Sequence, residues 1–223
     1  VSKSVAINDS YNTGAVSTGG SYVGGLIGNF GWSGSATAKN CYNTGDVSAT
    51  GSSSNYVGGL AGYSRSCTIT DCYATGTVTN SGSGSYVGGL VGSPSTSDHI
   101  TSTFYYNEST PCRALGSSQD ILSNVFIIQS ASYAGAAGGV ELSKEAFEHG
   151  EATYLLNGGA EHGTVWTNGT VHPVLGDETT AALYEVSVKP KSVGTKATAT
   201  VNLPDGYWVS GDSLIGYRAY VPA

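Results

Sequence analysis

Charged residues are scarce in this 223-residue sequence, and basic residues are the scarcest. Asp, Glu, Lys and Arg make up 11% of the chain, and only nine Lys and Arg residues offset the acidic ones, which leaves a net charge of -7. A protein that binds nucleic acid needs a basic surface for the phosphates. We therefore expect no nucleic-acid partner. The same balance disfavours electrostatic docking on anionic lipid.

Long apolar runs and methionine are also missing. No apolar run approaches the roughly 20 residues that a membrane-spanning helix needs, so we expect no membrane insertion. Met is absent and the sequence begins at Val1, from which we expect a processed or excised segment.

The cysteines are few, and none has the CxxC or His–Cys spacing of a zinc site. We expect no metal and no other cofactor. Disulfides, for which three pairings exist, and small buried apolar residues are both open for Cys41, Cys67, Cys72 and Cys112.

Glycine and tyrosine are abundant, and they recur in two motifs. The first reads SYVGGLIG at 21–28, NYVGGLAG at 55–62 and SYVGGLVG at 85–92. The second reads YNTG at 11–14 and 42–45 and YATG at 73–76, a constant spacing of 31 residues. Self-similarity at such a period indicates a repeat architecture.

Each period holds three short strand signals separated by Gly, Ser and Asn. This pattern predicts a mostly β fold: a right-handed parallel β-helix with three strands per turn of about 31 residues. Successive turns of such a solenoid stack at about 4.8 Å, so equivalent residues form columns. The predicted columns are Tyr11, Tyr42 and Tyr73; Tyr22, Tyr56 and Tyr86; Leu26, Leu60 and Leu90; and Cys41 and Cys72, with Phe104 continuing that row.

The paired glycines need an explanation of their own. Val23 and Leu26 are three residues apart, so a regular strand cannot bury both side chains. We predict a corner at Gly24-Gly25, where glycine permits a positive φ, a bulge or a close approach of the next turn. The residues with this structural role are Tyr22, Gly24, Gly25, Leu26 and Gly28, then Tyr56, Gly58, Gly59, Leu60 and Gly62, then Tyr86, Gly88, Gly89, Leu90 and Gly92.

The combination of YVGGLxG with CYxTGxV resembles the GLUG motif family over about residues 9–107. Such repeats occur in large secreted and surface-anchored bacterial proteins, including adhesins and the non-catalytic part of immunoglobulin A-cleaving metallopeptidases. The resemblance implies an extracellular or cell-surface module that acts in adhesion or as a stalk. Its partner would be a host or cell-surface protein or a glycan whose identity the sequence does not specify.

The second half of the chain has a different character. Residues 1–98 carry only seven of the charged side chains. We predict a repeat solenoid over 1–107, a capping segment over 108–176 and a C-terminal β-strand segment over 177–223. LSKEAFEHGEATYLLNGG resembles the short helical segment that closes such arrays. Gly150 is expected to divide it into two helices, with Phe147, Tyr154, Leu155 and Leu156 facing inward.

Candidate catalytic chemistry is sparse. The glycine motifs lack the helix and Lys-Ser/Thr of a phosphate loop, and His149 and the other histidines lack a metallopeptidase spacing. Asp9, Asp46 and Asp71 occupy non-equivalent offsets, which disfavours a glycosidase groove. The Thr-x-Thr row of an ice-binding face is not repeated either. We therefore expect a non-enzymatic module.

Two alternatives remain open. The chain could be the non-catalytic accessory region of a secreted enzyme, either a host-directed metallopeptidase or a carbohydrate-active protein. It could also be a glycan-binding module that uses exposed tyrosine rows, because tyrosine offers apolar area with a polar tip. Tyr11, Tyr42 and Tyr73 are the candidate ligand-facing residues, against the alternative that their rings pack within the solenoid and brace its turns.

Overall fold

The structure of the protein is a computed structural model. It describes residues 4–31, 34–51, 55–82, 86–107, 112–117, 122–129, 139–141, 144–148, 151–158, 165–169, 171–176, 183–185, 208–209 and 218–220. The chain divides into two compact units, Val1–Ser143 and Lys144–Ala223. Among the described residues, no helix is both long enough and apolar enough to span a membrane.

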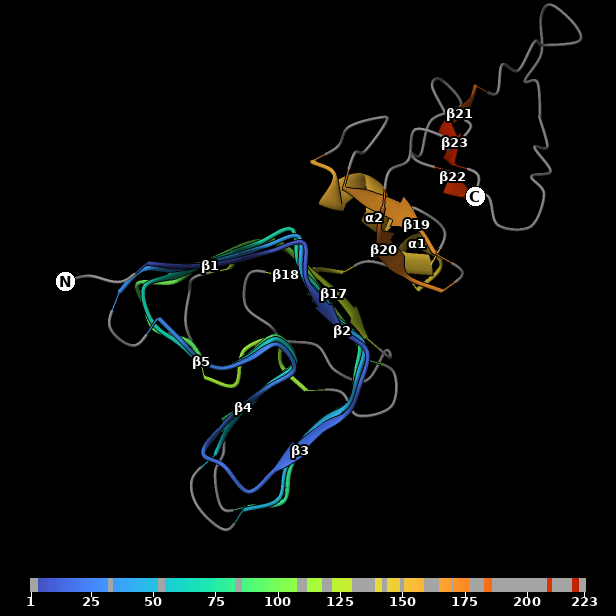
Figure 1. Ribbon diagram of the computed structural model, residues 1–223. Coiled ribbons are helices and arrows are strands. Elements are labelled where there is room, and N and C mark those ends of the chain that lie inside the picture. Colours follow the sequence, from blue (N-terminus) through green and yellow to red (C-terminus); the bar gives the residue numbers. More distant parts are fainter. Residues whose placement is uncertain are drawn as a thin grey trace, which may run out of the picture. The chain divides into compact units, whose positions relative to one another are not determined.

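The first unit is a parallel β-solenoid, and Figure 1 shows equivalent strands of successive laps lying over one another. We call residues 5–35 lap 1, residues 36–66 lap 2 and residues 67–97 lap 3. The strands of lap 1 are β1 (Val5–Asn8), β2 (Tyr11–Asn12), β3 (Val16–Thr18), β4 (Tyr22–Gly24) and β5 (Ile27–Phe30). Those of lap 2 are β6 (Ala36–Lys39), β7 (Tyr42–Asn43), β8 (Val47–Ala49), β9 (Tyr56–Gly58) and β10 (Ala61–Ser64). Those of lap 3 are β11 (Cys67–Thr70), β12 (Tyr73–Ala74), β13 (Val78–Asn80), β14 (Tyr86–Gly88) and β15 (Val91–Ser93).

Three further strands extend the largest sheet beyond lap 3. They are β16 (His99–Asn107), β17 (Leu122–Gln129) and β18 (Gly139–Glu141), each parallel to the one before it. β16 pairs with both β11 and β12, so it continues two strands of the lap at once. β17 and β18 follow the boundary predicted at residue 107, yet they belong to the same unit as the repeats.

The predicted β-helix is confirmed, but each lap contains five short strands where the sequence predicted three. One extra break comes from a residue with a left-handed backbone between the first and second strands of each lap. These residues are Asp9, Asn40 and Asp71, with φ values of 49°, 54° and 52°. Asp and Asn tolerate this conformation better than most residues. Their 31-residue spacing was the sequence signal for the break.

The other extra break is the glycine corner, which is confirmed. Val23 is 1% exposed in one apolar cluster, and Leu26 packs against a different one. None of the motif glycines at this corner has a φ in the left-handed region, so close approach is the reason for glycine. A Cβ on Gly58 would meet the backbone oxygen of Ala61 and lie 2.7 Å from the backbone nitrogen of Gly92.

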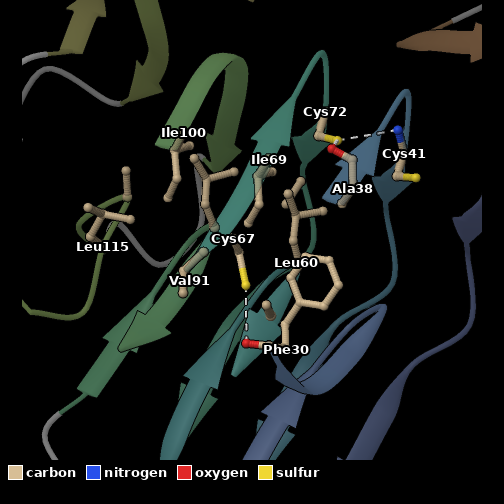
Figure 2. Close-up of a cluster of buried hydrophobic side chains, with 14 of the residues drawn as sticks. Phe30, Ala38, Cys41, Leu60, Cys67, Ile69, Cys72, Val91, Ile100 and Leu115 are labelled. Carbon is tan, nitrogen blue, oxygen red and sulfur yellow. Dashed lines mark hydrogen bonds between the residues drawn. The ribbon is translucent and has the colours of Figure 1, made fainter. Parts of the chain in front are cut away.

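The predicted leucine column is confirmed. The Leu26 N–H donates to the Leu60 carbonyl at 3.0 Å, and the Leu60 N–H donates to the Leu90 carbonyl at 2.9 Å. Ala114 then continues the column after Leu90, at 2.8 Å. These residues border the larger apolar cluster, part of which Figure 2 shows: Phe30, Leu60, Ile69, Val91 and Ile100 come from successive laps and pack together.

One charged residue is buried at the edge of this core. Asp98 is 1% exposed. Its carboxylate accepts hydrogen bonds from the Ser64 hydroxyl at 2.6 Å and from the backbone N–H groups of Cys67 and Ser95, each at 2.8 Å. A buried carboxylate of this kind is stable because its oxygens have donors.

We expect Asp98→Asn to destabilise the solenoid by about 2 kcal/mol, because an amide NH₂ would face donors that the carboxylate now accepts from. Urea unfolding followed by circular dichroism measures the loss. Asp46→Asn is the matched control: Asp46 is exposed and accepts the Thr77 N–H at 2.8 Å, a bond that the Asn oxygen can retain. Equal stability of the two variants would contradict this assignment.

The second unit begins with two short helices, as predicted. α1 spans Lys144–Glu148 and α2 spans Glu151–Leu156. Phe147 and Leu156 are buried, whereas Tyr154 and Leu155 are half-buried. Gly158, just after α2, has a left-handed φ of 71°, as glycines that end helices commonly do. That these helices close the solenoid stays a prediction.

The remaining described strands of this unit are antiparallel. β19 (Trp166–Asn168) pairs with β20 (Pro173–Leu175), and the Asn157 side chain bonds to both the N–H and the carbonyl of Trp166. β21 (Leu183–Glu185), β22 (Trp208–Val209) and β23 (Arg218–Tyr220) form a small sheet in the order β21-β23-β22. Most of the C-terminal β-strand segment predicted over 177–223 lies outside the described residues.

Candidate functional site

The first tyrosine column stacks as predicted, but most of it is inside. Tyr11, Tyr42 and Tyr73 pair in register, with ring centroids 4.9 Å apart at both steps and planes within 6° of parallel. Tyr11 is 60% exposed, Tyr42 is 5% exposed and Tyr73 is fully buried. The interpretation of this column as ligand-facing is therefore wrong for Tyr42 and Tyr73, because the stacked laps cover them. Burial raises the pKa of both phenols, so they stay neutral.

The row after this column also corrects a prediction. Phe104 pairs with Tyr73, so it continues the tyrosine column. The Cys41 and Cys72 row continues instead to Thr103, which precedes Phe104 in the buried part of β16. The constant spacing of 31 residues already places Phe104 after Tyr73 and Thr103 after Cys72. Aligning Phe104 with the cysteines shifts the row by one residue.

Cys41 and Cys72 are neighbours in adjacent laps, as predicted. The Cys41 N–H donates to the Cys72 sulfur at 3.4 Å (Figure 2). Hydrogen bonding between the two thiol side chains lowers the pKa of Cys41, while burial raises that of Cys72. Burial raises the pKa of Cys67 to about 11. All four cysteines are free thiols, and Cys41, Cys67 and Cys72 are buried. Raised pKa values in apolar surroundings make Cys67 and Cys72 poor nucleophiles.

The second tyrosine column is the one that reaches the surface. Tyr22, Tyr56 and Tyr86 pair in register on β4, β9 and β14. Their ring centroids lie 5.3 and 5.0 Å apart, and the planes are 11° and 21° from parallel. Tyr22 is 37% exposed and Tyr86 is 39% exposed. The next residue in each strand points inward, and Val23 and Val57 are buried. Strand alternation therefore directs the tyrosines outward.

Tyr63 on β10 completes this surface. Its ring meets Tyr22 and Tyr56 edge-on, with centroids 5.7 and 6.0 Å away and planes at 64° and 73°. We call Tyr22, Tyr56, Tyr63 and Tyr86 the exposed tyrosine cluster. Neither Tyr56 nor the other column members were singled out as ligand-facing from the sequence, because residue type alone does not distinguish the two columns. The apolar Val that follows each motif Tyr was the available signal, because neighbouring residues of a strand point to opposite sides.

The stacking decides which part of each ring is available. Both faces of Tyr56 are covered by Tyr22 and Tyr86, so this residue offers a partner its ring edge and polar tip. Ring edges carry the positive end of the aromatic quadrupole and suit oxygen acceptors. The outward faces of Tyr22 and Tyr86, at the ends of the column, are the places where an apolar or sugar ring could stack.

The acidic candidates have structural partners. Asn40 Nδ2 donates to Asp9 Oδ1 at 2.8 Å. Burial raises the pKa of Asp71, which lies at the equivalent corner of lap 3. Among the described residues, no group of three or more His, Cys, Asp or Glu side chains is placed to hold a metal ion. His149 and His162 lie outside the described residues.

Comparison with known proteins agrees with the repeat architecture. The sequence profile of the GLUG motif matches residues 53–79, which run from just before β9 to within β13. No curated protein matches the chain.

A solved structure from Bacteroides ovatus, described as a "putative immunoglobulin A1 protease", is similar with a TM-score of 0.58 and 24% identity. The similarity covers 76% of this chain and 57% of that one, so the chain spans just over half of its length. This likeness concerns the fold. The chain therefore carries the GLUG motif within a β-solenoid.

Proposed function

We propose that the chain is a non-catalytic binding module of a secreted or surface-displayed bacterial protein, acting in adhesion. The observation that carries the proposal is the exposed tyrosine cluster on the side of a repeat scaffold. Tyrosines concentrate binding energy at protein interfaces because each buries a large apolar area at little cost in side-chain entropy. The partner is a glycan or a protein presented on a surface.

The scaffold supports this role because the laps hold the rings in place. The strand of Tyr56, β9, pairs with β4 on one side and with β14 on the other, and the neighbouring Val23 and Val57 are anchored in the core. The rings are therefore ordered before a partner arrives. Preorganisation of this kind lowers the entropic cost of binding.

One finding supports a location outside the cell. The GLUG motif at 53–79 resembles the repeats of large secreted and surface-anchored bacterial proteins. The low charge and the many tyrosines bear on binding instead, because they suit a surface that contacts other molecules through apolar and hydrogen-bonding groups.

The test is a binding assay with the purified chain on a glycan array and on immobilised immunoglobulin A1, the substrate class named for the similar structure. We expect Tyr22→Ser combined with Tyr86→Ser to weaken binding at least about tenfold, since each lost aromatic anchor costs about 1 kcal/mol or more. The control is Val171→Ser, which removes an apolar side chain that is 58% exposed in the second unit. Equal binding by the double variant and the control would contradict the assignment. Cleavage of either target would overturn the non-catalytic role.

A second candidate is the accessory region of a secreted protease, and the likeness to the Bacteroides ovatus structure favours it. Under this alternative the chain binds immunoglobulin A1 and leaves it intact, and glycans on the array give no signal. Binding to glycans alone would favour adhesion.

A further inference from the structure

Lap 1 ends the stack with open strand edges. Each of its five strands is at the end of its sheet path: β1 and β2 terminate the largest sheet, and β3, β4 and β5 terminate the three-stranded ones. Val5 is 52% and Tyr11 60% exposed, while their equivalents Ala36 and Tyr42 are 2% and 5% exposed. Among the described residues of the first unit, none pairs with these outer edges. An open edge of this kind is a template for another strand.

The backbone of lap 1 has groups directed away from lap 2. Tyr42 N–H donates to the Ser10 carbonyl at 3.1 Å, and Thr44 N–H donates to the Asn12 carbonyl at 3.0 Å. Successive residues of a strand direct their carbonyls to opposite sides. The carbonyl and the N–H of Tyr11 therefore point outward, along the direction in which the next lap would stack.

The asparagine side chains give the edge a direction. Asn12 Nδ2 donates to Asn43 Oδ1 at 2.8 Å, and Asn43 Oδ1 also accepts the Gly45 N–H at 3.2 Å. Asn12 Oδ1 accepts the equivalent Gly14 N–H at 3.1 Å. It therefore has room for the donor that Asn43 receives from the lap before it. An asparagine amide from a preceding lap fits this position.

The glycine at position 14 gives separate evidence that lap 1 can accept a preceding lap. A Cβ on Gly45 would collide with the Gly14 carbonyl, and a Cβ on Gly76 would collide with the Gly45 carbonyl, so each glycine accommodates the lap before it. A Cβ on Gly14 would lie 3.5 Å from Asn12 Oδ1, an ordinary contact. Lap 1 thus has the glycine that makes room for a preceding lap, at a position where the described structure requires none.

We propose that the outer edge of lap 1 is a docking site for one further lap of the same repeat, stacked in parallel register and carrying the Tyr-Asn-Thr-Gly sequence. Its tyrosine covers Tyr11, its asparagine donates to Asn12 Oδ1, and its glycine carbonyl lies against Gly14. A second copy of this chain fits less well, because the far end of the largest sheet is formed by β18 (Gly139–Glu141), which carries no Tyr-Asn-Thr-Gly sequence to meet Tyr11, Asn12 and Gly14. Two copies that met through their lap 1 edges would pair with reversed strands, which would break the tyrosine and asparagine registers.

The experiment adds a lap to the full chain. A copy of residues 36–66 takes the place of residues 1–4, directly in front of Val5. The copied Ser66 then precedes Val5 as it precedes Cys67 in the native chain. Hydrogen exchange measured by mass spectrometry is then compared with the original chain. We expect amide exchange over 5–24 to slow at least about tenfold, because those strands gain partners on both sides.

Gly14→Ala is the discriminating variant. In the original chain this substitution should leave the amide hydrogen exchange of lap 1 and the melting temperature unchanged. In the extended chain it should abolish the slowing, because the added Cβ meets the carbonyl of the incoming glycine. Unchanged exchange in the extended chain, or slowing that survives Gly14→Ala, overturns the proposal. Sedimentation of the original chain supplies a last outcome: a dimer that Tyr11→Asp dissociates would assign the edge to a second copy and would also overturn it.

Discussion

Gly58→Ala is expected to destabilise the solenoid by about 4 kcal/mol, at the upper end of what single substitutions do. The atoms that the new Cβ would meet are backbone atoms of Ala61 and Gly92, held by the strand ladders of laps 2 and 3. Neither can move without breaking the stacking at the corner. Urea unfolding followed by circular dichroism should show a midpoint at lower urea concentration, with an unchanged dependence of the unfolding free energy on urea.

The matched control is Gly20→Ala. The nearest atoms to a Cβ at Gly20 belong to the Thr18 side chain, 3.6 and 3.9 Å away, and its φ lies outside the left-handed region. We expect a change within about 0.5 kcal/mol, or a slight gain from a less flexible unfolded chain. If Gly58→Ala is tolerated as well as Gly20→Ala, close approach is not what the glycine motif provides.

Tyr73→Ala is expected to cost about 4 kcal/mol, the range for truncating a large buried aromatic residue. Tyr73 is fully buried, stacks on Tyr42 with the planes 5° from parallel, and pairs with Phe104 on its other side. Removal leaves a cavity between two fixed laps and ends the stacking in the middle of the column. Thermal unfolding of the variant measures the loss.

Tyr11→Ala, in the same column, is the comparison. Tyr11 is 60% exposed and stacks on Tyr42 alone. Its loss should cost less than about 1 kcal/mol, the value of one aromatic pair near the surface. Similar losses for the two variants would show that the column does not gain stability from burial.

The columns were predictable from the sequence because a solenoid places equivalent residues over one another at a constant period. Leu26, Leu60 and Leu90 are adjacent for this reason. The glycine corner was predictable from the three-residue offset between Val23 and Leu26. Both features follow from spacing, which the sequence shows directly.

Exposure was harder to predict, because it depends on the side of the strand to which each residue points. Tyr42 and Tyr56 have the same residue type and the same repeat, yet the first is buried and the second lies on the surface side of its strand. Asp98 was missed for a related reason. It occupies the column of Ala36 and Cys67, and a single acid in an apolar column has no repeated pattern to reveal it.

The constant height of a lap has an evolutionary consequence. Duplication of one 31-residue lap would add one rung to each aromatic column without disturbing the others, because each lap contacts its immediate neighbours in the stack. The reach of the molecule and the number of tyrosines it displays would then grow together, in steps of about 4.8 Å. Recombination between repeats could in this way change the binding affinity without the evolution of a new binding surface.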